Sequence, residues 1–181
     1  MRKLIEAAFV SLDGVVESPA EWAFQYFIQE ENKKSSFTQL MDCDALLLGR
    51  VTYEEMLAIG AATKGDPYFD RVGSLPKHVA STTLREATWN ATVIQGDVSK
   101  EVGKLKKQSG KSIMKYGCGS LDKALIENGL IDEFHFTIFP VIVGKGRRLF
   151  EGVDTTRLKL TLTETKRFSN GAVKLSYVQE K

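Results

Sequence analysis

Short apolar runs alternate along the chain with longer segments in which apolar and polar positions are mixed. Residues 4–12 are almost all apolar, which is typical of a strand that is buried on both faces of a sheet. Further short apolar runs predict strands at residues 45–48, 78–81, 92–95, 112–116 and 133–139.

The mixed segments predict helices. Residues 21–41 carry apolar side chains at spacings of three and four, which favours one long helix. Shorter helices are expected at 52–59, 99–108 and 120–128, the last one ended by Gly129. Glycines and prolines gather in residues 60–76, so a loop is expected there.

Near the end of the chain, residues 158–168 and 172–177 flank Asn170-Gly171, a pattern that predicts a β-hairpin. The repeated order of strand and helix before it indicates a mostly parallel sheet covered by helices, with the hairpin adding antiparallel strands. We expect a single α/β domain over residues 1–181. In such sheets ligands bind beyond the carboxyl ends of the strands, so the turns from strand to helix are the candidate sites.

Composition narrows the classes of function. The chain has 25 basic and 23 acidic residues and a formal net charge of +2, which argues against nucleic acid or an anionic membrane as the main partner. Its apolar runs are far shorter than a membrane span. Cys43 and Cys118 are expected as thiols of a cytoplasmic protein, with a disulfide between them as the alternative. His78 and His135 are the only histidines available as further ligands, so no structural metal site is expected.

Two glycine turns can bind an anion at the start of a helix. In the first, Gly49 and Arg50 precede Thr52, which can cap the helix and form a capping box with Glu55. The alternative is a capped helix with a surface arginine.

The second turn is Gly117-Cys118-Gly119-Ser120-Leu121, with Ser120 as the expected N-cap. It is an incomplete dinucleotide fingerprint, because Asp122 stands where a third glycine is usual. The alternative is a tight turn that needs a positive φ.

Two further segments carry polar groups after a strand. Lys77 precedes a strand that ends in Ser81 and Thr82, a set that can hold a sugar phosphate or simply form a polar loop. The basic glycine loop at 143–148 is either a solvated or subunit-contacting loop or an anion site for the substrate.

Taken in order, these motifs resemble the dihydrofolate-reductase-like superfamily, and within it the reductase domain of riboflavin-biosynthesis deaminase–reductases and its stand-alone relatives. The resemblance covers about residues 3–178. It is carried by Ser11-Leu12-Asp13-Gly14, 44–54, 76–81, 117–121, 129–133 and 140–144. It implies a three-layer α/β/α fold around a mostly parallel mixed sheet, and a homodimer.

The resemblance also implies NADPH as cofactor and hydride donor. The positions that match the family's cofactor-binding turns are Gly49, Arg50, Thr52, Lys77, Ser81, Thr82, Gly117, Cys118, Gly119, Ser120 and Leu121. Asp13 and Glu133 match the family's acidic positions and are the expected proton donors. Trp22 and Phe24 are expected to line the substrate pocket, with core packing as their alternative role.

The implied reaction is that of a 5-amino-6-(5-phosphoribosylamino)uracil reductase in riboflavin biosynthesis. Ala7 stands where those enzymes carry a lysine. Two alternatives therefore stay open: a reductase of the same fold acting on another carbonyl, imine or pterin, and a nucleotide-binding homodimer without turnover.

Overall fold

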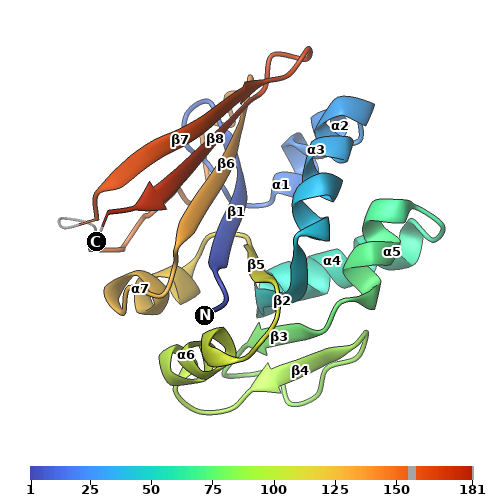
Figure 1. Cartoon of the computed structure of the whole chain (residues 1–181). Coiled ribbons are helices and arrows are strands. Elements are labelled where there is room, and N and C mark those ends of the chain that lie inside the picture. The colour runs from blue at the N-terminus through green and yellow to red at the C-terminus, as the bar shows by residue number, and fades with distance from the viewer. Residues whose placement is uncertain (155–157, 181) are drawn as a thin grey trace.

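The chain folds around one twisted eight-stranded sheet with the order β4-β3-β2-β5-β1-β6-β8-β7 (Figure 1). The structure is a computed structural model and describes residues 1–154 and 158–180. The strands are β1 (Leu4–Ser11), β2 (Cys43–Gly49), β3 (Lys77–Ala80), β4 (Ala91–Ile94), β5 (Ser112–Tyr116), β6 (Glu133–Phe139), β7 (Leu160–Arg167) and β8 (Val173–Gln179). Strands β1 to β6 run parallel, whereas β8 is antiparallel to both β6 and β7. The mostly parallel sheet and the terminal hairpin are thus confirmed.

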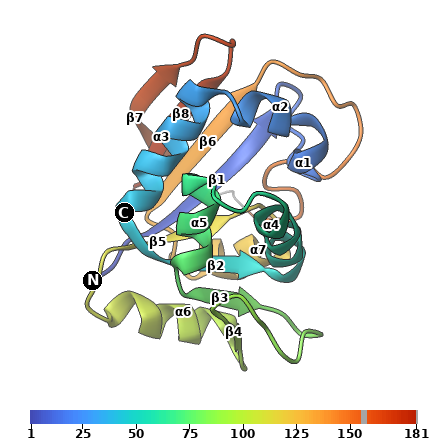
Figure 2. The same cartoon turned by 90° about the vertical axis from the view of Figure 1, so that its right-hand side faces the viewer.

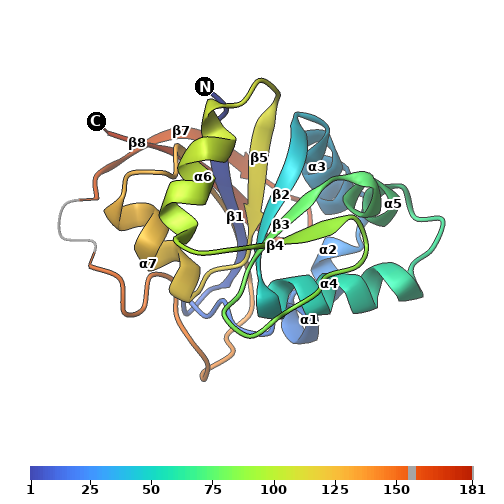
Figure 3. The same cartoon turned by 90° about the horizontal axis from the view of Figure 1, so that it is seen from below.

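Helices cover both faces of the sheet and give the fold three layers (Figure 3). They are α1 (Pro19–Trp22), α2 (Phe24–Phe27), α3 (Glu30–Met41), α4 (Arg50–Ala62), α5 (Pro67–Ser74), α6 (Val98–Lys107) and α7 (Ser120–Glu127). Helices α6 and α7 lie on one face, and Figure 2 shows α3, α4 and α5 across the other. None of the helices in the described part of the chain is long and apolar enough to cross a membrane.

The central strands are apolar at successive positions because each face meets a helix layer. Leu4 packs in the same core as Val102 of α6 and Leu125 of α7. The next residue, Ile5, points to the opposite face and shares a core with Leu40 of α3. Alternate residues of the same strands therefore pack into the two cores on opposite faces of the sheet.

The single long helix expected over 21–41 is wrong, because the segment forms three helices. Gln29 has an extended backbone, with φ −65° and ψ 138°, and separates α2 from α3. This turn lets Phe27 pack on Phe9, 5.5 Å between ring centroids, while α3 runs on to place Leu40 in the core below β2. The packing of these aromatic residues therefore favours a break at Gln29, although the spacing of the apolar residues favours a continuous helix.

The loop expected over 60–76 is also wrong, because α5 forms within it. Pro67 occupies the first position of the helix, where its missing N–H costs no hydrogen bond. The Asp66 carboxylate caps the helix by accepting from the backbone N–H of Tyr68 (3.0 Å) and Phe69 (3.4 Å). The proline was therefore a start signal for a helix rather than a mark of a loop.

Candidate functional site

A cleft of about 460 Å³ opens where β2, β3 and β5 end at their carboxyl termini. We call it the turn cleft. The residues expected at the cofactor that line it are Gly49, Arg50, Thr52, Ser81, Thr82, Gly117, Cys118, Gly119, Ser120 and Leu121. The parallel register brings these separate turns to one edge of the sheet, as the rule for parallel sheets predicts. A dinucleotide fits this set, since two helix N-termini and a row of hydroxyls face one hollow.

The first glycine turn begins α4 without the expected cap. The helix starts at Arg50 with Gly49 as N-cap, so Thr52 and Glu55 lie inside the helix and form no capping box. The Arg50 guanidinium instead pairs with Glu54, 2.7 Å between Nη1 and Oε2, on the exposed side of the helix. The Thr52 side chain is thereby free to face the second turn.

The second glycine turn is held tightly. Gly117 has φ +77°, a conformation that favours glycine. The N-cap of α7 is Gly119 rather than Ser120, and the Asp122 carboxylate accepts from the Gly119 N–H at 2.6 Å. The expected cap at Ser120 is therefore wrong, because Ser120 is the first residue of the helix and Asp122 instead accepts from the N–H of the N-cap residue. The backbone amides of Ser120 and Leu121 have no backbone acceptor among the described residues.

Lys77 lies away from the turn cleft, contrary to expectation. It begins β3, and Ser81 follows the other end of the strand, about 13 Å further along. Its ammonium donates to the carbonyls of Gly73 (3.0 Å) and Leu75 (2.8 Å) and lies 4.2 Å from the centre of the Trp89 ring. Burial lowers the pKa of Lys77 to about 8.

A second hollow of about 290 Å³ adjoins the turn cleft on the side of α1 to α5. We call it the apolar cavity, because Phe24, Phe27, Met56, Ile59, Tyr68 and Phe69 form much of its wall. Thr52, Gly117, Cys118 and Arg147 line both hollows, so the two meet at these residues. A cofactor in the turn cleft can therefore reach a substrate in the apolar cavity.

Trp22 lies outside this cavity and takes the alternative role of core packing. Its side chain is buried, its ring meets Phe139 edge to face at 6.4 Å, and its Nε1 donates to the Glu17 carbonyl. The neighbouring Phe24 contributes to the cavity wall in its place.

The charged residues Glu17, Glu55 and Arg147 line the apolar cavity. Sequence reasoning did not place the two glutamates at a ligand site, whereas Arg147 lies in the basic loop that it offered as an anion site. Burial, together with the charge of Glu21, raises the pKa of Glu55. The only sequence signal for Glu55 is its place one helical turn after Thr52, which puts both residues on one face of α4.

Arg147 comes from the basic glycine loop and crosses from one hollow to the other. Its guanidinium donates to the Cys118 carbonyl at 3.0 Å and lies 3.7 Å from the position of a Cβ on Gly119. The structure thus brings one arginine of this loop to both hollows, and the expected anion site for the substrate stays a prediction.

Asp13 follows β1 but lines neither of the two hollows. Its carboxylate accepts from the Ser11 hydroxyl at 2.7 Å and from the amides of Val143 (3.1 Å) and Gly144 (2.8 Å). These hydrogen bonds lower the pKa of Asp13 to about 2. An ionised carboxylate with such partners ties two loops together and is a poor proton donor at neutral pH.

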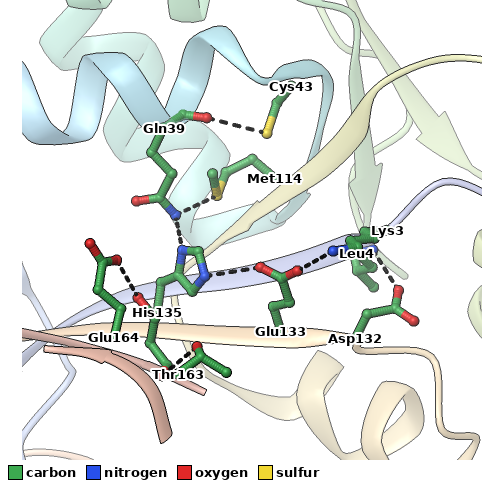
Figure 4. A network of polar contacts seen from close by, with 11 residues as sticks. Lys3, Leu4, Gln39, Cys43, Met114, Asp132, Glu133, His135, Thr163 and Glu164 are labelled. Atoms are coloured by element: carbon green, nitrogen blue, oxygen red, sulfur yellow. Dashed lines mark hydrogen bonds and ion pairs between the residues drawn. The ribbon is translucent and has the colours of Figure 1, made fainter. Parts of the chain in front are cut away.

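Glu133 lies at the opposite edge of the sheet from the turns, because it begins β6 and pairs in register with Ile5 of β1. Its carboxylate bonds Lys3 at 2.7 Å and the His135 Nε2 at 3.1 Å (Figure 4). His135 in turn contacts Gln39 through Nδ1, at 2.5 Å, and lines the apolar cavity. Glu133 therefore orients a wall residue, and the structure does not bring it together with Asp13.

Solved structures of other proteins share this architecture. A dihydrofolate reductase of Enterococcus faecalis, complexed with NADP(H), matches 99% of this chain and 97% of its own, at 16% identity and a TM-score of 0.65. A Thermotoga maritima deaminase/5-amino-6-(5-phosphoribosylamino)uracil reductase matches with a TM-score of 0.68 at 15% identity, over 99% of this chain and 57% of that chain. The fold is thus dihydrofolate-reductase-like.

The family follows from the sequence match. Residues 2–174 match the family described as the RibD C-terminal domain, and the chain belongs to this family. The uncharacterized protein YyaP of Bacillus subtilis (strain 168) is 32% identical over 97% of this chain and 94% of its own length.

Proposed function

We propose that the protein is a reductase that takes NADPH as its hydride donor. The observation that carries the proposal is the junction of the turn cleft and the apolar cavity at Thr52, Gly117 and Cys118. Because hydride transfer needs direct contact of donor and acceptor carbons, two adjoining hollows of different chemistry suit the reaction.

The chain's own residues divide the work between the hollows. The amides of Ser120 and Leu121 and the guanidinium of Arg147 offer donors to the diphosphate, and Ser81 and Thr82 offer hydroxyls to a further phosphate. When bound, NADPH supplies the hydride at its nicotinamide ring. The aromatic wall of the apolar cavity excludes water from that transfer.

Glu55 replaces Asp13 and Glu133 as the proposed proton donor. Its carboxyl group lines the apolar cavity, whereas Asp13 lines neither hollow and Glu133 lies at the far edge of the sheet. A raised pKa keeps a larger share of this group protonated, as a general acid requires.

The first candidate substrate is 5-amino-6-(5-phosphoribosylamino)uracil, because the chain belongs to the family of the RibD C-terminal domain. A second candidate, an unphosphorylated carbonyl, imine or pterin, is favoured by the cavity itself. Ala7 places a methyl group in its wall where riboflavin-pathway reductases carry a lysine, and Glu17 and Glu55 face it. Carboxyl groups form hydrogen bonds with ring nitrogens, and Arg147 is the residue of this cavity wall that a substrate phosphate would need.

The test begins with fluorescence titrations of the purified protein with NADPH and NADH in parallel. We expect saturable binding with preference for NADPH. Oxidation of NADPH is then followed with the phosphoribosylaminouracil and with unphosphorylated pterins, carbonyls and imines. If neither nucleotide binds, the reductase proposal is wrong; if NADPH binds but no substrate is reduced, the nucleotide-binding homodimer without turnover is favoured, and light scattering measures its mass.

A further inference from the structure

A buried polar network lies directly beneath the second glycine turn. Glu6 of β1 and Lys115 of β5 are register partners in the parallel sheet, and Asp122 of α7 completes the set. The three residues are 0%, 1% and 2% exposed, respectively. Burying three ionisable groups is costly unless each is paired, so such a network calls for an explanation beyond simple packing.

Each residue of the turn is attached to this network by one hydrogen bond. The Lys115 ammonium donates to the Gly117 carbonyl at 2.5 Å. The Cys118 thiol donates to Glu6 Oε1 at 3.0 Å. The Gly119 amide donates to Asp122 Oδ2 at 2.6 Å.

The ammonium of Lys115 offsets the negative charge of the two acidic residues in the network. Lys115 Nζ forms an ion pair with Asp122 Oδ1 and lies 3.6 Å from Glu6 Oε2. Burial alone would lower the pKa of Lys115, but the two carboxylates outweigh burial and raise it. The ammonium therefore supplies the positive charge at the place where Glu6, Cys118 and Asp122 come within 4.8 Å of one another.

The network also decides which groups of the turn face the cleft. The Gly117 carbonyl and the Gly119 amide are held by Lys115 and Asp122, so neither is available to a ligand. Drawing the negative Gly117 carbonyl away from the cleft favours an anion there. The amides of Ser120 and Leu121, at the start of α7, remain as donors.

We propose that Lys115 and Asp122 are positioning residues, which hold the Gly117–Gly119 turn in the shape that accepts the diphosphate of a dinucleotide cofactor. They act through the turn, since their side chains are buried. The inference rests on the proposed function and adds residues that no cofactor atom needs to touch.

The test compares Asp122→Ala with Asp122→Asn, in titrations with NADPH and with adenosine 2′-monophosphate, which has no diphosphate. Asp122→Ala removes the acceptor of the Gly119 amide, and we expect about tenfold weaker NADPH binding. Asp122→Asn keeps an acceptor oxygen and should bind NADPH within about threefold of the wild type. Neither change should alter the affinity for adenosine 2′-monophosphate.

Leu125→Ala is the matched control, because Leu125 is buried in the same helix and its side chain forms none of the hydrogen bonds that hold the turn. It should lower the unfolding temperature and leave NADPH affinity unchanged. Lys115→Met is made together with Asp122→Asn, so that both charges of the buried ion pair are removed at once and the acceptor of the Gly119 amide is kept. About tenfold weaker NADPH binding is expected here too, because the Gly117 carbonyl loses its donor, and wild-type affinity would contradict the role of Lys115. If this double variant does not fold, the comparison of Asp122→Ala with Asp122→Asn tests the proposal.

Three results would overturn the inference: wild-type affinity in Asp122→Ala, an equal loss of affinity for both nucleotides, or an equal loss in Leu125→Ala. A wild-type protein that binds neither nucleotide contradicts the proposed function itself, and that outcome is visible before any variant is made.

Discussion

The Thr52 hydroxyl oxygen lies 2.5 Å from the position that a Cβ atom on Gly117 would occupy. This approach joins the first turn of α4 to the glycine turn after β5, and both residues line the two hollows. A side chain at position 117 would clash with Thr52 and would also have to adopt φ +77°.

Gly117→Ala should therefore lower the free energy of unfolding by about 1–3 kcal/mol and weaken NADPH binding at least about tenfold. Urea unfolding and nucleotide titration measure the two effects. Gly103→Ala is the control, since Gly103 lies inside α6 with nothing within 4 Å of an added Cβ. It should gain about 0.5–1 kcal/mol and bind NADPH normally. Normal NADPH affinity in Gly117→Ala would contradict the role of the turn.

Asp13 should make stability depend on pH in acid. The Ser11 hydroxyl and the amides of Val143 and Gly144 lower its pKa from 3.8 to about 2. A lowered folded-state pKa means that the contribution to stability is full above about pH 4 and is lost as the pH falls to about 2. Asp13→Asn should show a smaller loss over this window in urea unfolding, with unchanged NADPH affinity. A strong loss of turnover with intact stability would restore Asp13 as a catalytic residue.

Arg147 and Arg148 provide a neighbouring pair for testing the basic loop. The Arg147 guanidinium lies at the Cys118 carbonyl and lines both hollows, whereas Arg148 lines neither. Arg147→Ala should weaken NADPH binding about five- to tenfold and reduce its dependence on salt. Arg148→Ala should leave both nearly unchanged. Equal effects of the two changes would indicate a general effect of net charge rather than a contact.

Ionisation of the Glu55 carboxyl group should lower the stability of the folded protein as the pH rises. Burial and the charge of Glu21 raise its pKa above 4.5. A raised folded-state pKa means that the folded protein favours the protonated form, and this contribution is lost as the pH rises through the folded-state value. Glu55→Gln should thus gain stability relative to the wild type as the pH rises above 4.5, measured by thermal unfolding. Glu54→Gln should show no such gain, because it removes the pair with Arg50.

Many local features could be predicted from the sequence because they depend on neighbouring residues. Gly129 ends α7 with φ +59°, and its amide bonds the Ile126 carbonyl at 2.9 Å. The Asn170-Gly171 turn joins β7 and β8. The failures were also local: Pro67 and Asp66 start a helix within a stretch that glycines mark as a loop, and Gln29 breaks a helix that apolar spacing favours.

For the site, local sequence predicts which turns contain glycine and hydroxyl groups, because strand, turn and helix are contiguous in the chain. Which side chains lie at the same edge of the sheet depends on how the strands pair. Lys77 and Glu133 begin their strands, whereas Ser81 and Asp13 follow theirs, and parallel pairing sends the two sets to opposite edges. The partnership of Glu6, Lys115 and Asp122 likewise depends on the register of β1 against β5 and on the packing of α7, which no local pattern specifies.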